Sequence, residues 1–347
     1  MTAEPYSVVV PSRGFDRLAA DSLSSIETSH HSSLREVLFV VDPRVNDLSH
    51  ERRIRQMPKV RVLAPTLEEP SVGALLNFGI SSCSTDLVFR HDADDLWVAG
   101  REALQLAELK QQVSVVAGRA ALLRGPRVRR DLAPPIPAGL LWSGGLLLGN
   151  PLVHPTVAMR LSHLPRGHLN DVYDASAVAE DYLLWLRLAL ASVPITVVPS
   201  VVTLYRRHPA QESNFLSVES AAPQLRPSIE CVASSLGISS APPIAITICR
   251  GSCGHDASDI SSYFRACGRM FAELQRLHPI EFKRHEAFLT GRAWLVAFRH
   301  RRELRSVGLL EIRRIVAELP VSSRAGLAVA MQVLRSPKQF EALTHPW

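Results

Sequence analysis

Residues 87–95 read Leu87-Val88-Phe89-Arg90-His91-Asp92-Ala93-Asp94-Asp95, an apolar run followed by a cluster of carboxylates. The apolar run is typical of a buried strand, and the carboxylates are expected in the loop that follows it. Neighbouring carboxylates repel one another unless a cation lies among them. Because Mg²⁺ and Mn²⁺ prefer oxygen ligands and often bind phosphate oxygens as well, the cluster indicates phosphate chemistry through a metal. On these residues alone, an acidic turn or a helix N-cap is the alternative.

Short apolar runs alternate with amphipathic segments around this stretch. The runs predict strands at residues 8–10, 37–41, 60–63, 87–89 and 113–116, and the segments between them predict helices at residues 17–26, 50–56, 72–81 and 101–110. This alternation predicts an α/β fold with a largely parallel sheet, which binds ligands beyond the carboxyl ends of its strands. Three polar segments are expected together at that edge: Pro11-Ser12-Arg13, Asp42-Pro43-Arg44 and the acidic cluster.

The composition is that of an ordinary globular protein, with 46% hydrophobic and 21% charged residues among 347. The net charge of +6 favours anionic partners, and nucleotide phosphates, anionic lipid and nucleic acid all fit it. No signal peptide is expected, because Val8-Val9-Val10 is closed by Pro11. No membrane span is expected, because the apolar run at residues 139–153 is broken by glycines, Asn150 and Pro151. Five cysteines, an odd number, are expected as reduced thiols in a cytoplasmic protein.

Six segments between residues 7 and 213 are informative as an ordered set. They are VVVPSRG, EVLFVVD, VGALLNFGISSCSTDLVFRHDADD, NPLVHPTVAMR, AEDYLLWLRL and LYRRHPAQES. The set resembles the family 2 glycosyltransferases, most closely the bacterial exopolysaccharide type, which have a GT-A nucleotide-sugar fold. One position departs from the common pattern: Leu76 precedes Asn77 where many members carry arginine, although a branch with leucine also exists.

The resemblance implies a Rossmann-like GT-A domain that binds a nucleotide-diphosphate-sugar with Mg²⁺ or Mn²⁺. Asp92 and Asp94 match the family's DXD motif, with Asp94 as the direct metal ligand and Asp92 near the ribose or the metal's water shell. Asp95 is expected to cap the following helix, and metal ligation is its alternative role. For Asp42 a plain turn before Pro43 is the alternative to donor binding. The other residues implied around the donor are Pro11, Ser12, Arg13, Asp42, Asn77 and Arg90.

Glu180-Asp181 opens an apolar segment at residues 182–188 that predicts a buried helix. Acids in a first helical turn are favoured by the helix dipole, which is the plain explanation of the pair. The resemblance implies that the pair faces the acceptor, where Asp181 takes the proton from the attacking hydroxyl and Glu180 orients the acceptor or the base. With one base on the face opposite the leaving group, direct displacement predicts inversion of the anomeric centre.

Two histidines match family positions. His208, beside Arg206 and Arg207, is expected to complete the metal or diphosphate site, with an ordinary surface loop as the alternative. His154 is either functional or a structural histidine beside a strand. Arg160 is expected to neutralise nearby carboxylates. The predicted metal ligands are Asp94, Asp92 and His208.

Three regions are predicted: a GT-A domain at residues 1–215, a linker with one short helix at 216–256 and a helical region at 257–347. Cys249, Cys253 and His255 approach zinc-ligand spacing without a clear fourth ligand. The arginine-rich residues 124–130 are expected to form a solvated loop or, alternatively, to meet a lipid-linked or acidic acceptor at a membrane surface. C-terminal helices with core-forming aromatic residues are expected at 260–277, 279–304, 309–319 and 324–334.

Together these features predict a metal-dependent, inverting glycosyltransferase of cell-surface polysaccharide synthesis, with a nucleotide-sugar donor, a glycan or lipid-linked acceptor and peripheral membrane contact. A non-catalytic GT-A protein that binds sugar nucleotide or glycan is the first alternative, and the intact Asp92, Asp94, Glu180 and Asp181 argue against it, since an inactive enzyme tends to lose such residues. A nucleotidyltransferase is the second, but the glycine-rich basic phosphate loop of that class is missing near Pro11. Nucleic acid is not an expected partner, because no basic motif with interleaved aromatic residues is present.

Overall fold

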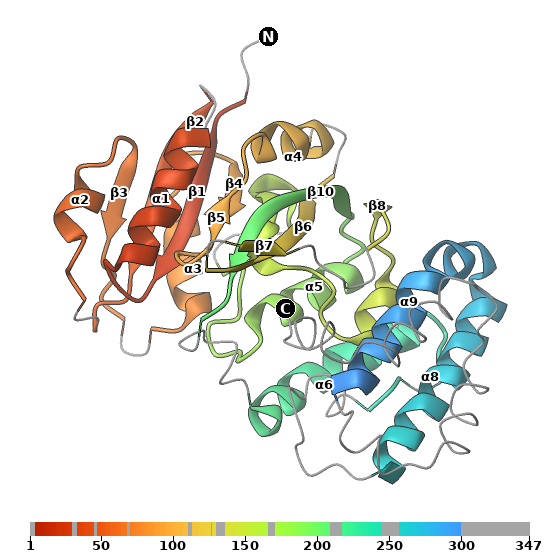
Figure 1. The fold of residues 1–347 in the computed structure, drawn as a ribbon. Helices are drawn as coiled ribbons and strands as arrows, with labels where there is room; N and C mark the ends of the chain where they lie inside the picture. The colour runs from red at the N-terminus through yellow and green to blue at the C-terminus, as the bar shows by residue number, and fades with distance from the viewer. Residues whose placement is uncertain are drawn as a thin grey trace.

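The computed structural model describes residues 4–29, 33–44, 47–67, 70–109, 113–125, 127–129, 136–165, 171–208, 217–239, 241–243 and 257–299. Within these residues ten strands form one mixed sheet in the order β3-β2-β1-β4-β9-β6-β10-β5, with β7 paired to β6 and β8 paired to β10 (Figure 1). The strands are β1 Tyr6–Ser12, β2 Leu34–Val41, β3 Val60–Leu63, β4 Leu87–Arg90, β5 Leu96–Trp97, β6 Val115–Arg124, β7 Arg127–Arg129, β8 Gly139–Leu140, β9 Ala158–Arg160 and β10 Ile195–Arg206.

Successive side chains of a strand point to opposite faces of the sheet, so the apolar strands present apolar side chains on both faces. Helices cover both of these faces. Val8 and Val10 of β1 belong to one hydrophobic cluster with residues of α1, α2 and α4, whereas Val9 belongs to a second cluster with residues of α3 and α5. The helices are α1 Arg17–Ser29, α2 Glu51–Arg55, α3 Val72–Ser81, α4 Arg101–Leu109, α5 Glu180–Leu190, α6 Val218–Ser235, α8 Ala257–Leu277 and α9 Pro279–Arg299, with 3-10 turns η1 Ser143–Leu148, η2 His154–Thr156 and η3 Leu161–His163.

Six of the described strands run in one direction. β1 pairs in parallel with β2 and β4, β2 with β3, and β6 with β10, while β9 lies antiparallel between β4 and β6. The carboxyl ends of β1, β2 and β4 therefore meet at one edge, where Ser12 lies opposite Val41 and Arg90 lies opposite Val9. The prediction that the polar segments after these strands lie together is confirmed.

The elements predicted for the first half of the chain are confirmed, with small differences at their ends. β3 and α3 have the predicted bounds. α3 begins after Ser71, whose hydroxyl accepts a hydrogen bond from the backbone N–H of Ala74 and so satisfies one of the free donors of the first turn. β6 runs further than expected, to Arg124, because it pairs along its length with β10.

The arginine-rich residues 124–130 do not form the solvated loop that was predicted. Over its described part this segment is a hairpin, in which the end of β6 pairs antiparallel with β7. Gly125 has φ +55°, a left-handed conformation that glycine adopts without steric cost, and this allows the turn. Arg127 and Val128 are exposed on β7, and Arg130 lies outside the described residues.

The predicted linker with one short helix is also corrected, because α6 is 18 residues long. Ala221, Leu225, Ile229 and Val232 lie at helical spacing and are buried. Pro223 and Pro227 fall on the exposed face of the helix, so the buried apolar face outweighs two residues that usually end helices. The richness of this segment in proline, serine and alanine concealed that pattern.

Helices α8 and α9 pack against each other and extend the core that begins under the sheet. The predicted core role of the C-terminal aromatic residues is confirmed for those with described side chains: Tyr263, Phe264, Phe271, Phe282, Phe288 and Trp294. The helices expected at 309–319 and 324–334 lie outside the described residues. The boundaries at 215 and 256 stay predictions, since one continuous hydrophobic cluster joins the sheet to α6, α8 and α9.

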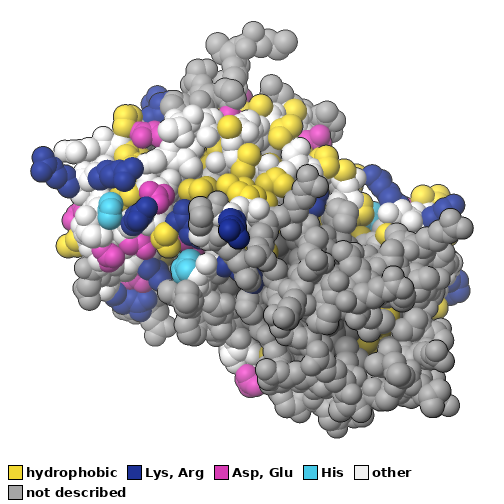
Figure 2. All heavy atoms as spheres, in the orientation of Figure 1, with side chains coloured by type: hydrophobic (Ala, Val, Ile, Leu, Met, Phe, Trp, Pro, Cys, Tyr) yellow, Lys and Arg dark blue, Asp and Glu magenta, His cyan; other side chains and the backbone are white. Residues whose placement is uncertain are grey.

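The surface gives two further facts about the described part of the chain. Figure 2 shows positive and negative side chains interspersed over the sheet-bearing part, so the net positive charge is not gathered there into one patch on this face. Among the described residues, no helix combines the length and hydropathy that are needed to cross a bilayer.

Gly79 fixes how closely α3 approaches β1 and β2. A Cβ at this position would lie 2.5 Å from Val9 Cγ1 and 3.0 Å from Val40 Cγ2. Helix propensity alone would make Gly79→Ala stabilising by about 1 kcal/mol. We expect the overpacking, at about 1–3 kcal/mol, to reverse that sign in urea unfolding. Ser81→Ala, at the exposed end of α3, is the matched control and is expected to change the unfolding free energy by less than about 0.5 kcal/mol. A more stable Gly79→Ala variant would contradict this packing.

Candidate active site

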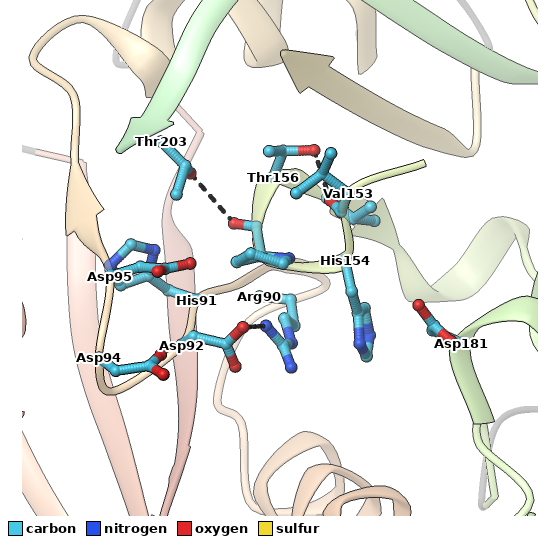
Figure 3. Close-up of polar contacts among 12 residues, drawn as sticks. Arg90, His91, Asp92, Asp94, Asp95, Val153, His154, Thr156, Asp181 and Thr203 are labelled. Carbon is cyan, nitrogen blue, oxygen red and sulfur yellow. Dashed lines mark hydrogen bonds and ion pairs between the residues drawn. The ribbon is translucent and has the colours of Figure 1, made fainter. Parts of the chain in front are cut away.

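The acidic cluster lies directly after β4, at the edge where the parallel strands end (Figure 3). Oxygen atoms of Asp92, Asp94 and Asp95 all lie within 4.8 Å of one another. Asp92 is paired with Arg90, whose Nη1 lies 2.5 Å from Asp92 Oδ2. This set of oxygen donors fits a hard divalent cation.

Asp95 does not cap a helix, so that prediction is wrong. β5 follows it at once, and its carboxylate turns inward, where Oδ1 accepts a hydrogen bond of 2.8 Å from the backbone N–H of Arg206 at the end of β10. Its side chain is fully buried, and its Oδ2 has no hydrogen-bond partner among the described residues. Burial, with Asp94 and Asp92 close by, raises the pKa of Asp95 well above its usual range. A cation at the cluster would relieve this repulsion.

His208 reaches the same cluster from beyond the end of β10. Its Nε2 lies 2.8 Å from Asp94 Oδ2, and this hydrogen bond raises the pKa of the imidazole above 6.5. The predicted association of His208 with the acidic cluster is therefore present in the structure. Metal ligation by His208 stays a prediction. The raised pKa favours the protonated ring, and the imidazole must lose that proton to act as a ligand.

Two buried arginines lie behind the carboxylates, and sequence reasoning assigned no role to the second. Arg90 is 4% exposed, and its backbone oxygen accepts a hydrogen bond of 2.9 Å from Nη2 of Arg101. The guanidinium of Arg101 also donates to Thr203 at 3.1 Å and lies 4.1 Å from the centroid of the Trp97 ring. Burial, followed by the positive charge of Arg90, lowers the pKa of Arg101 to about 9. The pattern of α4 contained no signal for this role, because a first-turn arginine usually points to solvent.

The predicted donor residues of β1 and β2 lie at this edge but already have local partners. The Ser12 hydroxyl donates to the Gly14 backbone oxygen at 2.7 Å. The Asp42 carboxylate accepts from the backbone N–H of Arg44 at 2.9 Å and pairs with its guanidinium, and these bonds lower the pKa of Asp42. Pro11 is buried and Arg13 is exposed. The turn role of Asp42 is present, and its contact with a nucleotide stays a prediction.

Asn77 has a different environment from the one expected for a donor ligand. Its Nδ2 donates to the backbone oxygen of Tyr173 at 2.7 Å, and its Oδ1 accepts from the Tyr173 backbone N–H at 2.9 Å. The amide therefore clamps the chain of Tyr173 to α3. Direct contact between Asn77 and a donor stays a prediction.

Glu180 and Asp181 form the first turn of α5, as predicted. Asn150 donates from Nδ2 to Asp181 Oδ2 at 2.7 Å. Sequence reasoning missed this contact, although Asn150 opens the segment NPLVHPTVAMR. The bond from Asn150 therefore holds the Asp181 carboxylate in place at the start of α5.

His154 lies between the acidic cluster and the acidic pair, next to Arg90 in Figure 3. Its Nε2 is 2.8 Å from the Tyr173 hydroxyl, and its Nδ1 is 3.6 Å from Glu180 Oε1. Burial and the charge of Arg90 lower the pKa of His154 well below its usual range, so the ring is neutral. A neutral imidazole can accept from Tyr173 at one nitrogen while the other carries its proton toward Glu180.

Arg160 lies outside this site. Arg160 pairs with Glu4 at 2.7 Å and Asp86 at 3.3 Å, at the end of β4 away from the cluster, so it neutralises carboxylates other than those of the site. Cys249, Cys253 and His255 lie outside the described residues.

The chain is similar to one curated protein and to solved structures of another. The amylovoran biosynthesis glycosyltransferase AmsE of Erwinia amylovora is 24% identical over 188 residues, which are 52% of this chain and 68% of that protein. No model of a known protein family matches the chain.

Structures of S. aureus TarS residues 1–349 share the fold. The complex with UDP-GlcNAc is 14% identical, covers 99% of this chain and 93% of that chain, and superposes with a TM-score of 0.52. The complex with UDP is 15% identical, covers 97% and 91%, and has a TM-score of 0.50. At these identities the likeness concerns the fold alone. The predicted fold class, a mixed and largely parallel α/β sheet followed by C-terminal helices, is confirmed.

The bond between His208 and Asp94 predicts a pH-dependent stability of the metal-free protein. Because the folded pKa of His208 is raised, its contribution is fully present below the unfolded pKa of about 6.5 and is lost as pH rises through the folded pKa. In EDTA, we expect the Tm of wild type to exceed that of His208→Gln most at pH 5.5 to 6, with the gap closing toward pH 8.5. A gap that widens with rising pH would contradict the assignment.

Proposed function

We propose that this protein is a metal-dependent, inverting glycosyltransferase of the family 2, GT-A type, with a nucleotide-diphosphate-sugar donor. One observation carries the proposal: a carboxylate cluster that fits a cation and the acidic pair in the first turn of α5 lie at the same site, at the carboxyl edge of the sheet, with Arg90 and His154 between them (Figure 3). Ligands of open α/β sheets bind at such an edge.

The donor side is the acidic cluster and the ends of β1 and β2. Asp94 and Asp92 would hold Mg²⁺ or Mn²⁺, with His208 as a further ligand or a diphosphate partner. When bound, the cation stabilises charge on the departing diphosphate. Arg90 adds a fixed positive charge beside Asp92, and its rigid position follows from the bond between its backbone and Arg101.

The acceptor side is the first turn of α5. Asp181 takes the proton from the attacking hydroxyl, and a positioned base typically contributes about 10²–10⁴-fold in rate. Glu180, next to neutral His154, orients the acceptor or the base. Since the base lies across the site from the cation ligands, a single displacement inverts the anomeric centre. A product that keeps the anomeric configuration of the donor rules out this mechanism.

The similar proteins support the class of substrate. AmsE is named for amylovoran biosynthesis, and TarS has been solved with UDP-GlcNAc, so a nucleotide-sugar donor and a polysaccharide product fit this chain. The acceptor we propose is a hydroxyl of a glycan or lipid-linked glycan. Peripheral membrane contact is part of the same proposal, and the exposed Arg127 and Val128 of the β6–β7 hairpin are the described residues through which to test it.

A GT-A protein that binds sugar nucleotide or glycan without turnover is the alternative. Its donor side would need the carboxylate cluster, but it would not need Asp181 held by Asn150 at a helix N-terminus. The acceptor-side geometry therefore favours the enzyme.

A thermal-shift panel of UDP-, GDP- and dTDP-sugars tests the donor side, because a ligand of the folded state stabilises it by about 2.7 kcal/mol at about 100 times its Kd. We expect one nucleotide to raise the Tm of wild type only when Mn²⁺ or Mg²⁺ is present. Asp94→Asn is expected to lose that shift. Asp86→Asn, a half-exposed carboxylate that pairs with Arg160 at the other end of β4, is expected to keep it.

Each other outcome is informative. A shift that is the same in EDTA would contradict metal dependence. No shift with any nucleotide would remove the donor assignment and favour glycan binding without turnover, which the same assay tests with oligosaccharides as ligands.

A further inference from the structure

Helix α9 of the C-terminal region reaches the segment that carries Asn150. Arg292 is 6% exposed, and its Nη2 donates to the backbone oxygen of Asn150 at 2.9 Å and to that of Leu148 at 3.4 Å. A guanidinium offers donors in a fixed plane, so one side chain can fix two neighbouring carbonyls. Because its guanidinium is buried, Arg292 holds these two backbone oxygens in fixed positions.

Asn150 passes this contact on to the proposed base. Its backbone oxygen accepts from Arg292, its Nδ2 donates to Asp181 Oδ2 at 2.7 Å, and its Oδ1 accepts from the Leu152 backbone N–H at 3.1 Å. The residue is therefore held on the backbone side by α9 and points its amide at α5.

The same segment is held at other points. The Tyr182 hydroxyl of α5 donates to the backbone oxygen of Leu146. A Cβ on Gly145 would lie 3.1 Å from Cε1 of Phe288, so α9 also packs closely against η1. Helices α5 and α9 thus hold the chain at residues 145–150 between them, and the proposed base, Asp181, contacts the end of this segment.

We propose that Arg292 is a positioning residue for the transfer reaction: it fixes the main chain of Asn150, whose amide in turn fixes the Asp181 carboxylate. The C-terminal helices then serve the chemistry as well as the core. The inference rests on the proposed function for the role of Asp181, but its structural part does not. A displacement of about 1 Å in a reacting group can cost about 10²-fold in rate.

Hydrogen–deuterium exchange on the full chain tests the structural part without any turnover. In Arg292→Gln we expect faster exchange of the Leu152 and Tyr182 amides, whose N–H groups bond to Asn150 and Asp181. Arg284→Gln is the matched control, because this exposed arginine of α9 also donates to a backbone oxygen, that of Ala138, away from Asp181. In Arg284→Gln, the Leu152 and Tyr182 amides are expected to exchange at the wild-type rate.

Kinetics test the functional part through hydrolysis of UDP-GlcNAc to UDP and GlcNAc with Mn²⁺, in which water takes the place of the acceptor hydroxyl and gives its proton to Asp181. We expect kcat of Arg292→Gln to fall about 10- to 10²-fold with the KM for UDP-GlcNAc unchanged, because only the base has moved. Arg292→Lys, which keeps one charged donor, is expected to recover part of the loss. Asn150→Ala combined with Arg292→Gln is expected to cost no more than Asn150→Ala alone, since both act through one contact.

The outcomes separate this inference from the proposed function. If the Leu152 and Tyr182 amides of Arg292→Gln exchange as slowly as those of wild type, the inference is overturned. Additive losses of kcat in the double variant would also overturn it. Faster exchange spread over all of α8 and α9, with the same change in Arg292→Lys, would mean that Arg292 only docks the helices and would also overturn it. A wild type that releases no UDP counts against the donor or the enzyme, while the exchange result still decides the positioning.

Discussion

The crowding of one buried and two partly exposed carboxylates at the end of β4 is the constraint on which the rest of the structure depends. Asp95 is fully buried beside Asp92 and Asp94, which is costly unless opposite charges or hydrogen-bond donors lie close. Arg90 pairs with Asp92 from two residues away, whereas the distant end of β10 supplies His208 against Asp94 and the backbone N–H of Arg206 against Asp95. Removing one of these partners would leave a carboxylate of the cluster without its compensating contact, so these contacts hold the geometry of the cluster.

The proposed acceptor side is held in the same way, by hydrogen bonds between separate segments. Asn77 of α3 holds Tyr173, whose hydroxyl holds His154 beside Glu180. α3 can come this near because Gly73 has no side chain: a Cβ there would lie 3.1 Å from the backbone oxygen of Asp174. Side chains that are rigid before the substrate arrives lose little freedom in the reaction, which is a general requirement of catalysis by orientation.

Local sequence patterns predicted much of this molecule, because β3, α3 and the first turn of α5 depend on periodicity and on helix start signals within their own residues. The meeting of the polar segments at one edge of the sheet followed from the parallel order of the strands. The features that the sequence did not predict depend on contacts between residues far apart in the chain. Arg101 has the sequence context of a surface residue, and its burial depends on its bonds to Thr203 and Arg90. The two prolines of α6 made its buried apolar face hard to recognise. The role of Asn150 depends on its contact with Asp181, 31 residues away.

The central claim is that the carboxylate cluster after β4 binds a divalent cation together with a nucleotide diphosphate. Anomalous diffraction at the manganese edge, on crystals grown with Mn²⁺ and UDP, tests it most directly. The account predicts an anomalous peak bonded to the carboxylates of Asp94 and Asp92 and to diphosphate oxygens, with the base and ribose against the ends of β1 and β2. A nucleotide bound there without manganese at the cluster, or manganese bound elsewhere on the protein, would contradict it.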